Sequence, residues 1–103
     1  MILRGYENIQ IIQSLPKKSN NQLSTLRFSW KSCPKIEFYE VEIFNTNLSL
    51  FWKSDKLFIN ILWPSQELKK ELSLQKKYYW IVTAFCMNGK KYESKLTEFS
   101  LND

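Results

Sequence analysis

The side chains that carry most enzyme chemistry are scarce in this chain of 103 residues. It contains no histidine, so there is no Ser-His or Cys-His pair in which a base activates a nucleophile. Two glycines are too few for a loop that cradles phosphate. Glu40 and Glu42 share one face of a predicted strand, but carboxylates among lysine-rich neighbours are typical of solvated cross-strand partners. We therefore expect a protein that is not an enzyme and needs no cofactor.

Lysine supplies nearly all of the net charge of +5, because Arg4 and Arg27 are the only arginines. Four Lys-Lys pairs fall in predicted loops or turns, at positions 17–18, 69–70, 76–77 and 90–91. Such charge can form a patch for nucleic acid or anionic lipid. Phosphate-binding sites favour the bidentate fork of arginine, however, and lysine near strand ends blocks edge pairing. We therefore expect no nucleic-acid partner.

The segment from Leu72 to Ala84 gives the clearest indication of structure. It reads as a short entry loop followed by a long strand. Apolar or aromatic residues occupy both faces of this strand, with Tyr78, Trp80, Val82 and Ala84 on one side and Tyr79, Ile81 and Thr83 on the other. A period of two with such residues on both faces is typical of a strand packed at least partly on both sides.

Six further strands are predicted, at 9–15, 25–30, 37–44, 48–53, 57–63 and 90–101. Asn88-Gly89 predicts a type I′ hairpin turn, since both central residues of that turn need positive φ. The one helical stretch, 65–72, is too short to stand alone. This pattern predicts an all-β fold, a seven-stranded antiparallel immunoglobulin-like β-sandwich. The whole chain, 1–103, is expected to be a single domain with its core over roughly 9–101.

On these strands the chain resembles a fibronectin type III domain in its bacterial form. The likeness is carried by Leu26-x-Phe28-x-Trp30 and Tyr39-x-Val41-x-Ile43 in two strands, by Leu72 and Tyr78-x-Trp80-x-Val82-x-Ala84 in the tyrosine corner and central strand, and by Gly89, Ser94 and Phe99 in the last hairpin. The resemblance implies fibronectin type III topology. It also implies that the Tyr78 ring packs in the core while its hydroxyl bonds the backbone a few residues upstream.

The chain departs from that family at several points. Residues 73–77 lack the Pro-Gly usual before the corner tyrosine, and the last hairpin has no Arg-Gly-Asp, so integrin-type adhesion is not implied. An antibody-like domain fits less well, because its bridging cysteines would lie near Phe28 and Trp80, and neither position is a cysteine. The cysteines present, Cys33 and Cys86, are too few for a disulfide framework and, without histidine, for a zinc site. They would lie toward the same end of a sandwich, and both a bridge and free thiols are compatible with the sequence.

The resemblance implies a non-catalytic module that acts as a spacer or a protein-interaction domain. Bacterial domains of this kind occur in secreted enzymes, surface proteins and membrane regulators, so the resemblance implies an extracytoplasmic location: periplasmic, surface or secreted. The chain itself shows no signal peptide at residues 1–5 and no apolar run long enough for membrane insertion. We expect the partner to be another protein or a second copy.

The predicted contact surface is an aromatic face of the sheet. We expect the core to take Leu26, Phe28, Trp30, Tyr39, Val41, Ile43, Tyr78, Trp80, Val82 and Ala84. The other side of the central strand, with Tyr79, Ile81 and Phe85, then turns outward. In the resembled fold this strand lies beside the third strand, whose outward residues include Phe38 and Phe44. Contiguous apolar stripes of this kind commonly mark interfaces. The alternative is that lysine stems, the loop from Ser65 to Lys77 or the N-terminal residues cover the stripe.

Carbohydrate binding is the alternative function. Exposed aromatic rings can stack on the faces of sugars, and Trp52 and Trp63 are the candidates for such a platform. Trp63 precedes Pro64 at a strand end, however, where we expect it to close one end of the core.

Overall fold

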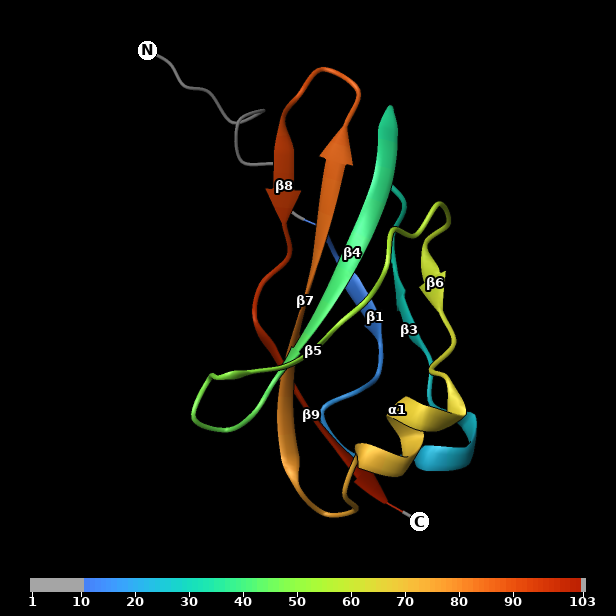
Figure 1. The fold of residues 1–103 in the computed structure, drawn as a ribbon, viewed down its shortest axis with the longest axis vertical. Coiled ribbons are helices and arrows are strands. Elements are labelled where there is room, and N and C mark those ends of the chain that lie inside the picture. The colour runs from blue at the N-terminus through green and yellow to red at the C-terminus, as the bar shows by residue number, and fades with distance from the viewer. Residues whose placement is uncertain (1–10, 103) are drawn as a thin grey trace.

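The computed structural model describes residues 11–102, which form two β-sheets packed face to face (Figure 1). The smaller sheet is antiparallel in the order β1-β3-β6, with strands β1 (Gln13–Leu15), β3 (Phe28–Trp30) and β6 (Ile61–Leu62). The larger sheet has the order β2-β9-β7-β4-β5, and β8 pairs with β7 beyond the end of β9. Its strands are β2 (Asn21–Gln22), β4 (Ile36–Phe44), β5 (Leu50–Lys53), β7 (Lys77–Cys86), β8 (Lys91–Glu93) and β9 (Thr97–Asn102).

The predicted all-β architecture is confirmed, but the prediction of seven strands in purely antiparallel pairing needs correction. Residues 11–102 contain nine strands, and β2 pairs with β9 in parallel. β2 lies in a stretch predicted to be a loop. The side-chain amide of Asn21 donates hydrogen bonds to the carbonyl oxygens of Lys17 (2.6 Å) and Ser100 (2.9 Å), and the bond to Ser100 holds the chain against β9.

The predicted strand 90–101 breaks at Ser94 into β8 and β9. The N–H of Ser94 donates to the carbonyl oxygen of Val82 (2.9 Å), and its Oγ accepts from the N–H of Val82 (3.0 Å), so the side chain replaces a backbone acceptor. Ser54 does the same on the opposite side of the sheet, with bonds of 2.9 Å to the carbonyl oxygen and the N–H of Val41. Because Val41 and Val82 are paired across β4 and β7, the two serines flank the centre of the sheet at one level.

Each serine marks a β-bulge, in which the outer strand has one residue more than the strand it pairs with. Leu57 makes the next pair, with Tyr39; it lies three residues beyond Ser54, whereas Tyr39 lies two residues from Val41. The same extra residue follows Ser94: Thr97, which pairs with Trp80, lies three residues beyond Ser94, whereas Trp80 lies two residues from Val82. The pairing of β1 with β3 also contains a register shift, so this edge of the smaller sheet is irregular as well.

The turn at Asn88-Gly89 is not the predicted type I′ turn. The N–H of Gly89 donates to the carbonyl oxygen of Cys86 (3.0 Å), and the N–H of Cys86 donates to that of Lys90 (2.8 Å). Gly89 has a φ of +83°, whereas Asn88 is not among the residues with positive φ. The loop therefore has three residues and a left-handed glycine at its last position, as in a type I turn followed by a G1 bulge.

The hairpin between β4 and β5 has the same geometry without a glycine. The N–H of Leu48 donates to the carbonyl oxygen of Asn45 (2.8 Å), and the N–H of Asn45 donates to that of Ser49 (2.9 Å). Leu48 thus occupies the position of Gly89, with a φ of +66°. A side chain in this conformation costs about 1–2 kcal/mol. The Leu48 side chain is 56% exposed and recovers little of that cost by burial.

Leu48→Gly is expected to raise the free energy of unfolding by about 0.5–1 kcal/mol, since glycine adopts the left-handed conformation without steric cost. The matched control is Gly89→Leu, which should lower the free energy of unfolding by about 1 kcal/mol. A Cβ at position 89 would meet no atom within 4 Å, so this loss of stability would come from the left-handed backbone conformation and not from a steric clash. Urea unfolding followed by circular dichroism measures both changes. A loss of stability in Leu48→Gly would show that its side-chain contacts outweigh the strain.

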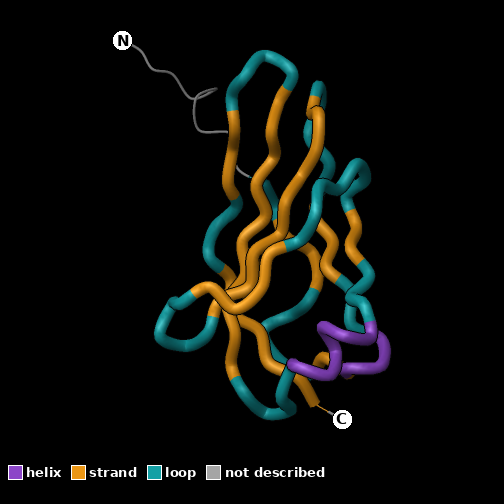
Figure 2. The backbone as a smooth tube through the Cα atoms, in the orientation of Figure 1, coloured by secondary structure: helices purple, strands orange, loops and turns teal. Residues whose placement is uncertain are grey.

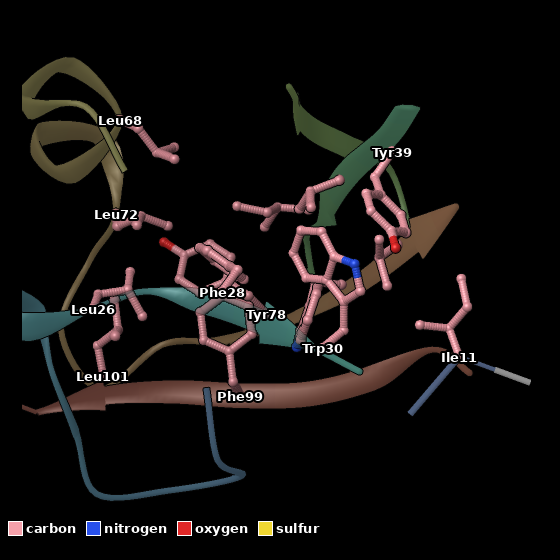
Figure 3. Close-up of a cluster of buried hydrophobic side chains, with 14 of the residues drawn as sticks. Ile11, Leu26, Phe28, Trp30, Tyr39, Leu68, Leu72, Tyr78, Phe99 and Leu101 are labelled. Atoms are coloured by element: carbon pink, nitrogen blue, oxygen red, sulfur yellow. The ribbon is translucent and has the colours of Figure 1, made fainter. Parts of the chain in front are cut away.

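The side chains predicted to face the core are all buried: Leu26, Phe28, Trp30, Tyr39, Val41, Ile43, Tyr78, Trp80, Val82 and Ala84. Phe28 packs edge-to-face against Trp80, with the ring centres 5.1 Å apart. It also packs edge-to-face against Phe99, with the ring centres 5.5 Å apart (Figure 3). Phe28 belongs to β3 and its two partners to β7 and β9, so these contacts join the two sheets.

Tyr78 has the geometry of a tyrosine corner. Its ring stacks on Phe99 with the ring centres 5.7 Å apart, and its hydroxyl accepts a hydrogen bond of 2.9 Å from the N–H of Ser73, five residues upstream. The loop between them is held at Gln75, whose φ is +63° and whose N–H donates to the carbonyl oxygen of Leu101 (2.7 Å). The bond from Gln75 thus fixes the loop without the Pro-Gly pair usual in the resembled family.

Two short helical segments lie at one end of the sandwich (Figure 2), η2 (Leu23–Thr25) and α1 (Gln66–Glu71). The helical turn predicted from the sequence is confirmed by α1. It begins after Ser65, whose Oγ accepts a hydrogen bond of 3.1 Å from the N–H of Leu68. Leu68 and the next residue of its face, Leu72, are buried and pack against the core.

Candidate interaction site

The five residues of the predicted interface lie together on the outer face of β4 and β7. Phe38 pairs with Phe85 and Phe44 pairs with Tyr79, while Ile81 lies between these two pairs. The rings of Phe38 and Phe85 are stacked, with centres 4.6 Å apart and planes 18° apart. The sequence therefore placed these side chains on one face, which we call the β4–β7 face.

Neighbouring side chains already cover much of the β4–β7 face. All five of its apolar residues are half-buried. The Nζ of Lys56 lies 4.6 Å from the ring centre of Phe38, and Glu40 makes an ion pair with Lys53 at 3.5 Å. Thr83, in the middle of the face, is only 5% exposed. Side chains of the same chain therefore partly cover the β4–β7 face. A partner would meet less apolar area on this face than five fully exposed apolar side chains would present.

The two candidate sugar-stacking residues do not share a surface. Trp52 of β5 pairs with the buried Ile43 of β4 and packs against the core from the larger sheet. Trp63 follows β6 of the smaller sheet, and the guanidinium carbon of Arg27 lies 5.6 Å from its ring centre. The expectation that Trp63 closes the core was wrong, because its side chain is 61% exposed and the following Pro64 is buried.

A more exposed apolar surface lies along β6 and was missed from the sequence. Phe58, Ile59 and Trp63 are 69%, 63% and 61% exposed. β6 is an edge strand of the smaller sheet and lies at the edge of the molecule (Figure 1). The signal was present in residues 57–63, which contain no charged residue, but alternation alone does not tell an edge strand from a central one. We call Phe58, Ile59, Ile61 and Trp63 the β6 edge.

The backbone of β6 offers hydrogen bonds on this edge. Phe28 pairs with Leu62 and Ser29 with Ile61, and the N–H of Trp30 donates to the carbonyl oxygen of Asn60 (3.3 Å). In an antiparallel ladder, successive residues turn their N–H and C=O groups to opposite sides. Since Asn60 and Leu62 face β3, the N–H and C=O of Ile61 face away from it. Within residues 11–102 no partner pairs with these two groups, so the β6 edge combines an unpaired backbone donor and acceptor with exposed apolar side chains.

Comparisons with protein-family models, curated protein sequences and solved structures found no match to this chain. Within residues 11–102, neither helical segment is long and apolar enough to cross a membrane. The same residues contain no group of three or more histidine, cysteine, aspartate and glutamate side chains arranged to hold a metal ion.

Proposed function

We propose that this protein is a non-catalytic β-sandwich module of the fibronectin type III kind that acts by contacting another protein. The strand order supports the kinship: β1, β3 and β6 form one sheet, and β5, β4, β7 and the β8–β9 segment lie side by side in the other. The bond between the Tyr78 hydroxyl and the N–H of Ser73 supports it as well. By the same kinship, the parent protein is bacterial and extracytoplasmic.

The observation that carries the proposed contact is the β6 edge. Natural edge strands are commonly protected by charged residues, by proline or by a bulge. Within 57–63 there is no such charge, and Pro64 comes only after the strand has ended. Large apolar side chains beside a free backbone edge suit the addition of an extended strand, whose main chain pairs while its side chains fill the apolar surface.

The distribution of charge favours a second copy of this chain as the partner of the β6 edge. The protein carries a net charge of +5, so most of its surface repels another copy. Residues 57–63 form an uncharged stretch along which two copies can approach without lysine facing lysine. An antiparallel β6–β6 contact would pair the free groups of Ile61 and bury Ile59 and Trp63 of both copies.

Solution mass tests this proposal by size-exclusion chromatography with light scattering across a concentration series. We expect the mass to rise toward that of a dimer, and Ile59→Lys to keep it at that of a monomer, because a charge at the contact must be buried. The matched control, Met87→Lys, also changes an exposed apolar residue, 71% exposed and outside the β6 edge, and should leave dimerisation intact.

Phe85→Lys separates the two candidate surfaces in the same experiment. It should leave the mass of the dimer unchanged if the β6 edge makes the contact. Loss of dimerisation in Phe85→Lys but not in Ile59→Lys would move the contact to the β4–β7 face. A monomer at every concentration would contradict self-pairing and favour a spacer role.

A further inference from the structure

The two cysteines line one small cavity. Cys33 follows β3 of the smaller sheet, and Cys86 is the last residue of β7 in the larger one. Both line a cavity of about 170 Å³, together with Pro34, Lys35, Asn88 and Tyr92. Both are free thiols, Cys33 half-buried and Cys86 buried. The fold has therefore brought together two thiols that are 53 positions apart in sequence.

Backbone hydrogen bonds hold the two segments in place. The N–H of Met87 donates to the carbonyl oxygen of Lys35 (3.0 Å), so the residue after Cys86 is bonded to the turn that follows Cys33. Lys35 has a φ of +58°, which reverses the chain at that turn. The N–H of Cys33 donates to the hydroxyl of Tyr39 (2.9 Å), a residue of the core. These bonds hold the two backbone segments beside the cavity that both thiols line.

We propose that Cys33 and Cys86 form an intramolecular disulfide when the protein meets a small-molecule disulfide such as oxidised glutathione. The more accessible Cys33 thiolate attacks one sulfur of oxidised glutathione, forms a mixed disulfide and releases one reduced glutathione. The Cys86 thiolate then attacks the Cys33 sulfur and releases the second. The protein loses two protons and two electrons, and oxidised glutathione gains them as two thiols.

The surroundings of Cys33 set the pH dependence of this reaction. Burial, and then the neighbouring Cys86, raise the pKa of the Cys33 thiol above its ordinary value. The thiolate is the attacking species, so its fraction is small at neutral pH and grows as the pH rises toward the raised pKa. Bridge formation should therefore be slow at neutral pH and faster at moderately alkaline pH.

The bridge would join the two sheets covalently at one end. It would close a long loop of chain, from the end of β3 to the end of β7, and so restrict the unfolded state. We expect oxidation to raise the Tm by about 10 °C, with reversal when the bond is reduced.

The test incubates the folded, reduced chain with oxidised glutathione and follows intact mass and peptide maps. In the denatured intact mass, the wild type should be a single chain that has lost two hydrogens, with Cys33 and Cys86 in one linked peptide. Cys86→Ser, the variant that lacks the second thiol, should instead stop as a mixed disulfide at Cys33. A wild type that keeps glutathione on Cys33, or that links to a second chain through either cysteine, would overturn the proposal. Because this readout is a covalent bond, it is independent of self-pairing at the β6 edge.

Discussion

Replacing Phe28 with alanine is expected to lower the free energy of unfolding by about 3–5 kcal/mol. The ring is fully buried on the central strand of the smaller sheet and is in edge-to-face contact with Trp80 and Phe99 of the larger one. Its removal would open a cavity between the sheets, and the rigid rings around it could close only part of that space. Urea unfolding followed by far-ultraviolet circular dichroism measures the loss.

Phe58→Ala is the matched control for this change. It removes the same ring from a side chain that is 69% exposed, so the free energy of unfolding should change by no more than about 0.5 kcal/mol. Equal losses in Phe28→Ala and Phe58→Ala would contradict the placement of Phe28 at the junction of the sheets.

Ser94→Ala is expected to cost about 1–3 kcal/mol, although it removes only one oxygen atom. The Ser94 hydroxyl accepts the hydrogen bond of the Val82 N–H at the centre of the larger sheet. Val82 is fully buried, so no water reaches the N–H group that the change leaves unpaired. Ser54→Ala should cost a similar amount, because the Ser54 hydroxyl does the same for Val41.

Amide hydrogen exchange gives a local readout of these two changes. Exchange at Val82 should accelerate in Ser94→Ala, and exchange at Val41 in Ser54→Ala. The two valines are direct partners in β4 and β7, so the cost of the double variant should differ from the sum of the single costs. Ser14→Ala, at an exposed position of β1, is the control and should leave stability nearly unchanged. Unchanged exchange at Val82 in Ser94→Ala would contradict the role of the hydroxyl as a replacement acceptor.

The core could be predicted from the sequence because it depends on a simple alternation. Along β4 and β7, side chains with a period of two identify which face is buried, and every residue of these two strands that was assigned to the core is buried. The strand count could not be predicted in the same way. β2 exists because one side chain, Asn21, bonds to a strand almost eighty residues away, and the strand 90–101 breaks because Ser94 bonds to Val82. Neither bond can be recognised from the alternation of apolar and polar residues around Asn21 or Ser94.

The candidate surfaces show the same division between local and long-range information. The alternation of β4 and β7 placed Phe38 and Phe85 correctly on the outer face. Their exposure depends on Lys56, which the pairing of Leu57 with Tyr39 brings over this face. Similarly, Trp63 looked like a core residue, and its exposure follows from the position of β6 at the edge of its sheet.

The irregular edges described above limit how far this protein can assemble. The larger sheet ends in β5, which leaves its partner at the Ser54 bulge, in the two-residue β2 and in the three-residue β8 beside β7. In the smaller sheet, β1 pairs with a shifted register. Among the described strands, β6 combines backbone groups that have no partner within residues 11–102 with an exposed apolar flank. A contact between two β6 edges is isologous: it uses the same surface of both copies and consumes it. If the β6 edges pair as proposed, the assembly closes at two copies and this contact cannot extend it into a fibre.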